Sequence, residues 1–180
     1  MIIDKTYFDG GTLNIPGTDQ IAIQEKIADF ISVYEPEYLQ RALGYPLWKL
    51  FTAALPTPAN PSRFYDLMNG VEYTDSCGNV QKWIGFNTVL NSPIAMYVWY
   101  WYSRDNATYS TSQGEQKGKT ENASNVSVMP KQRQYWNKMS KITHQLWDYL
   151  HNAKTNGSPT FPEWKWSLTG DLAVINEANL

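Results

Sequence analysis

The sequence contains few of the residues that most small catalytic and metal sites require. It has a single cysteine, Cys77, and only two histidines, His144 and His151. One cysteine cannot form an intrachain disulfide, and a structural zinc site needs several Cys or His ligands. A chain of 180 residues is long enough to be stabilised by an apolar core alone. We therefore expect no disulfide, no metal and no cofactor.

Charge and long apolar runs are also scarce. Charged residues make up 18% of the chain, against about 25% in an average domain. The formal net charge of −2 gives no overall attraction to nucleic acid or to anionic lipid. The most apolar stretch, residues 93–102, is far shorter than the ~20 residues of a membrane span. The first residues lack the basic and apolar regions of a signal peptide, so we expect neither a membrane segment nor a targeting segment.

Aromatic residues, in contrast, are abundant. The chain has 8 Trp, 12 Tyr and 6 Phe, which together make 14% of its residues. Tyr and Trp are enriched at protein interfaces, where one end of the side chain is dry and the other is wet. The composition is consistent with a subunit of a larger assembly, and equally with a monomer that has an aromatic core.

The apolar side chains follow helical periodicity over most of the chain. Between residues 19 and 35 they recur every three to four positions, which is typical of an amphipathic helix. Proline is tolerated in the first turn of a helix but not in its interior, so Pro36 predicts that one helix ends and another begins. Gly44 and Pro46 predict that this second helix ends and that a third begins. We expect further helices over residues 36–43, 46–55, 62–69, 91–105 and 131–152.

The rest of the pattern predicts a small hairpin and a long loop. Apolar and polar residues alternate on both sides of a Gly/Asn turn at 76–79, which is typical of a β-hairpin. Residues 106–128 are polar and of low complexity, so they cannot bury enough apolar surface to fold alone.

The fold class is therefore mainly α: a compact helical bundle of about five helices with a small β-hairpin, a long flexible loop and extended terminal arms. We divide the chain into an N-terminal arm (1–18), a helical domain (19–152, with the loop at 106–128) and a C-terminal tail (153–180). Because the tail carries Phe161, Trp164 and Trp166, we expect it to dock on this chain or on a neighbour.

The titratable residues form no catalytic pattern. His144 and His151 are close enough in sequence to share a helix face, but no carboxylate accompanies them at a suitable spacing. We interpret both as structural or surface histidines, and Cys77 as a free surface thiol. Glu35 and Glu37 flank the proline of an expected helix start, where carboxylates interact favourably with the helix dipole.

Basic residues gather around the polar loop. Residues 104–141 have a net charge of +4, and the remainder of the chain has −6. The segment Gly114–Thr120 approaches a phosphate-binding loop, but glutamine stands where the first glycine belongs and no apolar strand precedes it. We interpret the region as a solvated loop and helix face, with contact to a polyanion or an acidic neighbour as the alternative.

The order of these parts resembles a known family. A helical segment contains Phe30-Ile-Ser-Val-Tyr-Glu-Pro-Glu-Tyr-Leu-Gln-Arg-Ala-Leu-Gly-Tyr-Pro-Leu-Trp48, and an aromatic helix follows at Ser92-Pro-Ile-Ala-Met-Tyr-Val-Trp-Tyr-Trp-Tyr102. A polar loop then leads to a final helix with Tyr135-Trp-Asn-Lys-Met139. Over residues 20–152 this layout is similar to the head–tail connector (adaptor, or head-completion) proteins of tailed bacteriophages and prophages.

The resemblance implies a structural virion protein without enzymatic activity. Copies of the chain would form a ring, expected to be a dodecamer, beneath the portal protein, and DNA would pass through its bore without sequence-specific contacts. Other partners would be tail or stopper proteins, and the protein would be found in the virion and, during assembly, in the host cytoplasm. Ring interfaces are heterologous contacts that close. The candidate interaction residues are Tyr109, Lys117, Lys119, Lys131, Arg133, Trp164 and Trp166.

Two other hypotheses compete with this one. The first is a carbohydrate- or peptide-binding module that presents Trp83, Trp164 and Trp166 on its surface. The second is a small enzyme that uses His144 or His151.

Overall fold

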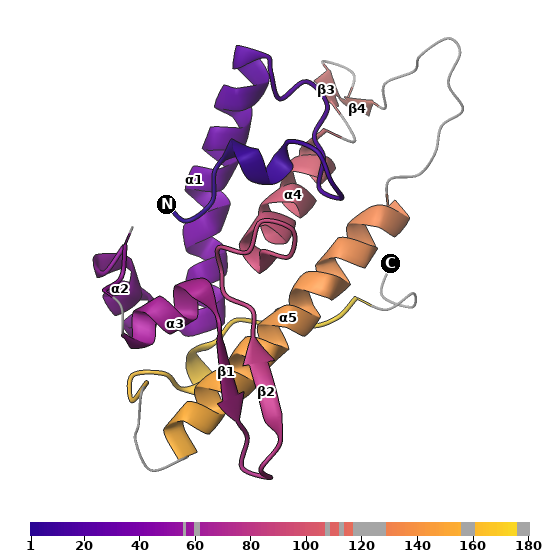
Figure 1. The fold of residues 1–180 in the computed structure, drawn as a ribbon. Helices are drawn as coiled ribbons and strands as arrows, with labels where there is room; N and C mark the ends of the chain where they lie inside the picture. Colours follow the sequence, from indigo (N-terminus) through magenta and orange to yellow (C-terminus); the bar gives the residue numbers. More distant parts are fainter. Residues whose placement is uncertain are drawn as a thin grey trace.

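The computed structural model describes residues 1–55, 57–59, 62–106, 109–111, 114–116, 129–155 and 161–175. Within these ranges the fold is mainly helical, with five α-helices and a two-stranded antiparallel hairpin, as predicted (Figure 1). The helices are α1 (Ile21–Leu43), α2 (Tyr45–Ala53), α3 (Arg63–Asn69), α4 (Pro93–Asp105) and α5 (Met129–Thr155). The main hairpin pairs β1 (Val71–Thr74) with β2 (Val80–Trp83), and a smaller one pairs β3 (Tyr109–Thr111) with β4 (Gly114–Gln116). Short 3₁₀ turns lie at η1 (Lys5–Phe8) and η2 (Trp166–Leu168).

Helix α4 forms the centre of the bundle. It packs against both α1 and α5, and Figure 1 shows it between them. The hydroxyl of Ser92 caps its first turn by accepting the N–H of Ala95 at 3.3 Å. From Pro93 to Trp99 every side chain is buried, and each large one contributes roughly 1.5–3 kcal/mol of transfer free energy. The first half of the aromatic helix is thus buried inside its own chain.

Helix α1 runs without interruption through Pro36, so the prediction of two helices divided there is wrong. Proline in a helix interior removes one hydrogen bond and costs about 3 kcal/mol. Buried side chains on both sides of it offset that cost, because Ile31 before the proline and Tyr38 and Leu39 after it enter the same core. The helix ends where predicted, at Gly44, whose φ of 72° is left-handed and whose N–H donates to the carbonyl of Gln40.

The N-terminal segment is not an extended arm, contrary to the prediction. Ile3, Phe8, Leu13 and Ile15 are all buried in the chain's own core. The N–H of Ile15 donates to the carbonyl of Phe8, which folds the segment back on itself. Four buried apolar side chains in fifteen residues explain the difference, because docking them on the bundle removes them from water.

The described part of the C-terminal tail, residues 161–175, also packs on its own chain instead of extending from it. Phe161 and Leu172 are buried. The indole N–H of Trp136 donates to the carbonyl of Ala173, and the N–H of Gly170 donates to that of Arg41. Residues 153–155 continue α5 beyond its predicted end, and residues 156–160 and 176–180 lie outside the described residues.

The β1–β2 hairpin forms around the predicted turn at 76–79, with Val71 opposite Trp83 and Thr74 opposite Val80. The flexible loop expected at 106–128 contains the short pair β3–β4, which the sequence pattern does not predict. The rest of that expectation falls on residues 107–108, 112–113 and 117–128, which lie outside the described residues.

Candidate functional site

The seven candidate interaction residues do not meet in one place. Lys131 and Arg133 lie in the first turns of α5, whereas Trp164 and Trp166 lie near Trp147 in its second half. Positions 131 and 147 are about 24 Å apart along the helix. Tyr109 belongs to β3, and Lys117 and Lys119 lie outside the described residues.

Cations cover aromatic rings where α4 ends and α5 begins. The ammonium of Lys131 lies 4.9 Å from the centroid of the Trp99 ring. The guanidinium of Arg104 lies 5.2 Å from the ring of Trp101. Such contacts stabilise by about 0.5–1 kcal/mol at exposed sites. Lys26 lies over the rings of Phe30 and Tyr102. We call the three cations and the rings that they cover the loop-proximal surface, because residues 106–128 connect the end of α4 to the start of α5: Lys26, Arg104, Lys131, Phe30, Trp99, Trp101 and Tyr102.

Side-chain hydrogen bonds and ion pairs hold this surface together. The amide of Gln132 on α5 donates to the hydroxyl of Ser103 on α4 at 3.1 Å. Lys26 on α1 forms an ion pair with Asp105 at 2.7 Å and donates to Asn106 at 3.0 Å. Three helix ends are therefore tied together at the point where the polar loop starts.

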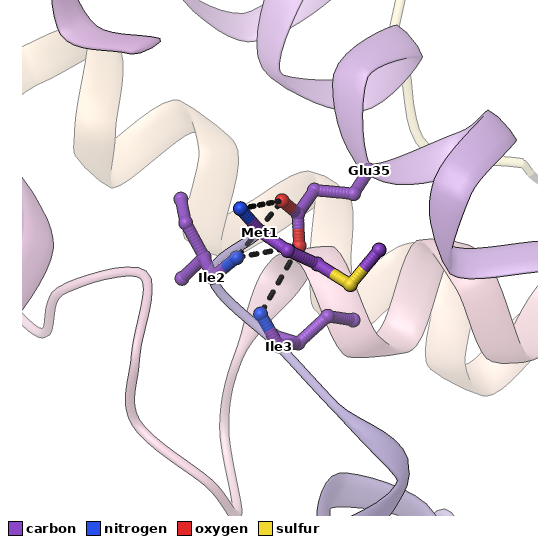
Figure 2. A network of polar contacts seen from close by, with 4 residues as sticks. All are labelled: Met1, Ile2, Ile3 and Glu35. Atoms are coloured by element: carbon purple, nitrogen blue, oxygen red, sulfur yellow. Dashed lines mark hydrogen bonds and ion pairs between the residues drawn. The ribbon is translucent and has the colours of Figure 1, made fainter. Parts of the chain in front are cut away.

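A second site lies where Glu35 of α1 contacts the first three residues of the chain (Figure 2). Glu35 is on the buried side of α1, and the whole residue has a relative exposure of 5%. Both oxygens accept the N–H of Ile2 at 2.9 Å, and one also accepts that of Ile3 at 3.0 Å. The Met1 ammonium lies 3.7 Å from the other oxygen. Burial raises the pKa of Glu35, against the lowering effect of these donors.

The prediction that Glu35 lies at a helix start is wrong, because α1 continues through Pro36. In the continuous helix, residues 27, 31, 35 and 39 follow one another at a spacing of four, which places them on one face. The other three are Ile27, Ile31 and Leu39, all buried. Extending the apolar stripe through Pro36 would have placed this carboxylate in the core.

A cavity of about 480 Å³ opens between α1 and α2 beside Glu35. Its walls include the apolar side chains of Ile31, Leu39, Trp48 and Leu55. The indole N–H of Trp48 is buried and has no partner within the described part of the chain. Both oxygens of Glu35 are occupied by backbone donors, so its arrangement is that of an anchor for the N-terminal segment.

The histidines and the cysteine lie at the surface, as interpreted from the sequence. Both His144 and His151 are exposed, and Cys77 is an exposed free thiol in the hairpin turn. Across the described residues, no three side chains of the metal-binding types come together. Nor does any helix in those ranges combine the length and hydropathy of a membrane span.

The tryptophans separate into buried and exposed groups. Trp83 is fully buried, and its indole N–H donates to the carbonyl of Leu67. Trp164 is 2% exposed and lies against Trp166, which is 59% exposed. The hypothesis that Trp83, Trp164 and Trp166 together form an exposed binding surface is therefore wrong, because Trp83 and Trp164 are not accessible to a partner. Only the tertiary fold distinguishes these tryptophans, because burial depends on distant segments.

Comparisons of the chain with models of protein families, with curated proteins and with solved structures found no match. Its function must be inferred from its own residues.

Proposed function

We propose that this chain is a structural subunit of a phage particle, a head–tail connector that forms a ring with copies of itself beneath the portal protein. The observation that carries the proposal is the loop-proximal surface. A rigid junction of three helix ends, covered by cations and aromatic rings, flanks a polar segment of 23 residues, 106–128.

The composition of that segment suits assembly. A sequence so poor in apolar side chains cannot supply a core of its own, so a partner surface is the usual source of the missing burial. The helix ends beside it are fixed by Lys26–Asp105 and Gln132–Ser103 contacts. These contacts fix the two helix ends from which the segment would reach a neighbouring subunit.

Exposed apolar side chains elsewhere support contacts between copies. Ile21, Val33, Val89 and Leu90 are all exposed, and Leu90 lies beside Gly11 of the N-terminal segment. Tyr45 on α2 is also exposed. A ring needs two different surfaces on each copy that fit one another, and side chains of this kind would become buried there.

The test is assembly with the cognate portal protein. Native mass spectrometry and negative-stain electron microscopy of the full chain with portal should show a ring of connector subunits bound to it. A chain that stays monomeric and separate from portal overturns the proposal. Isolated connector subunits can be monomeric, so the chain alone is not the decisive sample.

Variants then test the loop-proximal surface. Arg104→Ala combined with Lys131→Ala should reduce ring formation on the portal, because both cations border the polar segment. Lys49→Ala is the matched control, since Lys49 is an exposed lysine on α2, away from that segment. Equal ring formation by the double variant and by Lys49→Ala would contradict the role proposed for this surface.

A further inference from the structure

An open notch of about 340 Å³ lies between the second half of α5 and residues 166–173. His144 and Trp147 line it from the helix, and Trp166, Ser167 and Asp171 line it from the C-terminal segment. The proposed assembly role makes no use of this notch, which lies far along α5 from the loop-proximal surface.

Trp166 gives the notch a rigid aromatic wall. Its ring is in edge contact with Trp147 at 4.9 Å between centroids and with Trp164 at 6.1 Å. Those two indoles are buried, whereas 59% of Trp166 is exposed. Two buried neighbours thus hold the ring in place while most of its surface faces solvent. A ligand that stacks on it meets a surface that is already ordered, which reduces the entropy cost of binding.

Acceptors for hydroxyl groups line the same notch as Trp166. His144 Nδ1 lies 2.8 Å from the carbonyl of Ser140. A carbonyl only accepts, so Nδ1 carries the proton and Nε2 holds the lone pair in the neutral ring. One carboxylate oxygen of Asp171 accepts the N–H of Ala173 at 3.0 Å, and the other has no partner within the described residues. The hydroxyl of Ser167 is exposed.

We propose that the notch binds one ring of a neutral saccharide. The C–H face of a pyranose is weakly positive and stacks on the negative face of the Trp166 indole. Its hydroxyls donate to the free oxygen of Asp171 and to Nε2 of His144. Within the described part of the chain, no lysine or arginine lines the notch. The side chain of Arg41 lies against Gly170 beside it, but its guanidinium is paired with Glu37. A phosphate or uronate would therefore meet the Asp171 carboxylate, with the neighbouring cation already paired.

The test is an NMR titration of the ¹⁵N-labelled full chain. Maltotriose and N,N′,N″-triacetylchitotriose are the neutral probes, and adenosine monophosphate is the stacking anion. At least one neutral probe should shift the indole N–H signal of Trp166 and the backbone signals of residues 166–173. A single sugar ring in an open notch gives a dissociation constant on the order of 1 mM.

Three variants locate the binding. Trp166→Ala should abolish the shifts, and Asp171→Asn should weaken binding roughly tenfold, as expected for one hydrogen bond to a charged group. The asparagine keeps the oxygen that accepts from Ala173, so the segment retains this turn. Tyr45→Ala is the control, because it removes an exposed ring on α2 and should leave the titration unchanged.

Several results would overturn this proposal. They are the absence of shifts with both neutral probes, shifts that persist in Trp166→Ala, and stronger shifts with adenosine monophosphate. None of them affects the connector proposal, which portal assembly tests separately.

Discussion

Glu35 and Ile3 are joined by a buried hydrogen bond of 3.0 Å that spans 32 residues of sequence. The carboxylate lies on the core side of α1, and the N–H belongs to a segment with apolar side chains that enter the same core. One side chain in the middle of a long helix thus fixes the position of the first residues of the chain.

Replacing Glu35 should release the N-terminal segment. Glu35→Ala leaves the N–H groups of Ile2 and Ile3 without their acceptor, and we expect the free energy of unfolding to fall by about 3 kcal/mol. Urea denaturation measures this change, and hydrogen exchange should show faster exchange in residues 1–15. Glu25→Ala is the control, because Glu25 is an exposed glutamate of the same helix. Similar losses in the two variants would contradict the anchoring role.

The buried pair Tyr38 and Thr143 should respond asymmetrically to mutation. Their oxygens are 2.7 Å apart, and the hydroxyl of Thr143 donates to the carbonyl of Met139, so Tyr38 is the donor to Thr143. Thr143→Val leaves the fully buried Tyr38 hydroxyl without an acceptor and should cost about 2 kcal/mol. Tyr38→Phe leaves Thr143 bonded to Met139 and should cost about 1 kcal/mol. Thermal unfolding of both variants measures the order, and the reverse order would contradict the assigned donor.

Gly85 and Gly78 form a matched pair, because both have a φ of 85°. A Cβ at Gly85 would lie 2.6 Å from the backbone of Asn69 and of Gly70, whereas a Cβ at Gly78 would meet nothing within 4 Å. Gly78→Ala should cost about 1 kcal/mol of backbone strain. Gly85→Ala adds a clash between backbone segments and should cost about 1–3 kcal/mol more. Equal midpoints in urea would show that the segments after β2 and α3 move apart easily.

Arg63 and Glu163 connect α3 to the C-terminal segment through two parallel hydrogen bonds of 2.9 and 3.0 Å. These bonds to Arg63 hold the pKa of Glu163 below its usual range. A double-mutant cycle with Arg63→Ala and Glu163→Ala should give a coupling energy of about 1 kcal/mol, because the pair is partly exposed. The coupling should decrease as ionic strength rises. A value that does not respond to salt would contradict an electrostatic origin.

The buried tyrosines should make the fold sensitive to alkali. Burial raises the pKa of Tyr97 to about 12, and it also raises those of Tyr38 and Tyr149. Above pH 10 the unfolded chain loses these protons while the folded chain keeps them. The stabilising contribution is therefore complete below pH 10 and is lost as the pH rises toward 12. Ultraviolet titration should show part of the tyrosine ionisation coinciding with the loss of circular dichroism. Ionisation of every tyrosine with native circular dichroism would contradict this prediction.

Local signals in the sequence predicted most of the elements. Ser62 caps α3 and Gly70 ends it, and Ser92 caps α4 next to a proline in its first turn. These signals act within about four residues, so the sequence contains all the information they need. The hairpin turn around Gly78 was predicted for the same reason.

Three errors have a common cause. Pro36 lies inside a helix because apolar neighbours before and after it share one core. The terminal segments pack on the bundle because their apolar side chains contact residues far away in sequence. Such contacts also bury Trp164 while Trp166 stays exposed. Periodicity shows which side chains need burial but not which surface buries them.

By itself the sequence determined a mainly helical chain with a hairpin, a polar insert and an excess of aromatic side chains. The tertiary structure decided that these side chains are largely satisfied within one chain, that Glu35 holds the first residues, and that Trp166 borders an open notch. The physical reason is the separation of the interacting groups along the sequence. Capping and turn formation involve neighbouring residues, whereas burial and buried hydrogen bonds join groups that only the folded chain brings together.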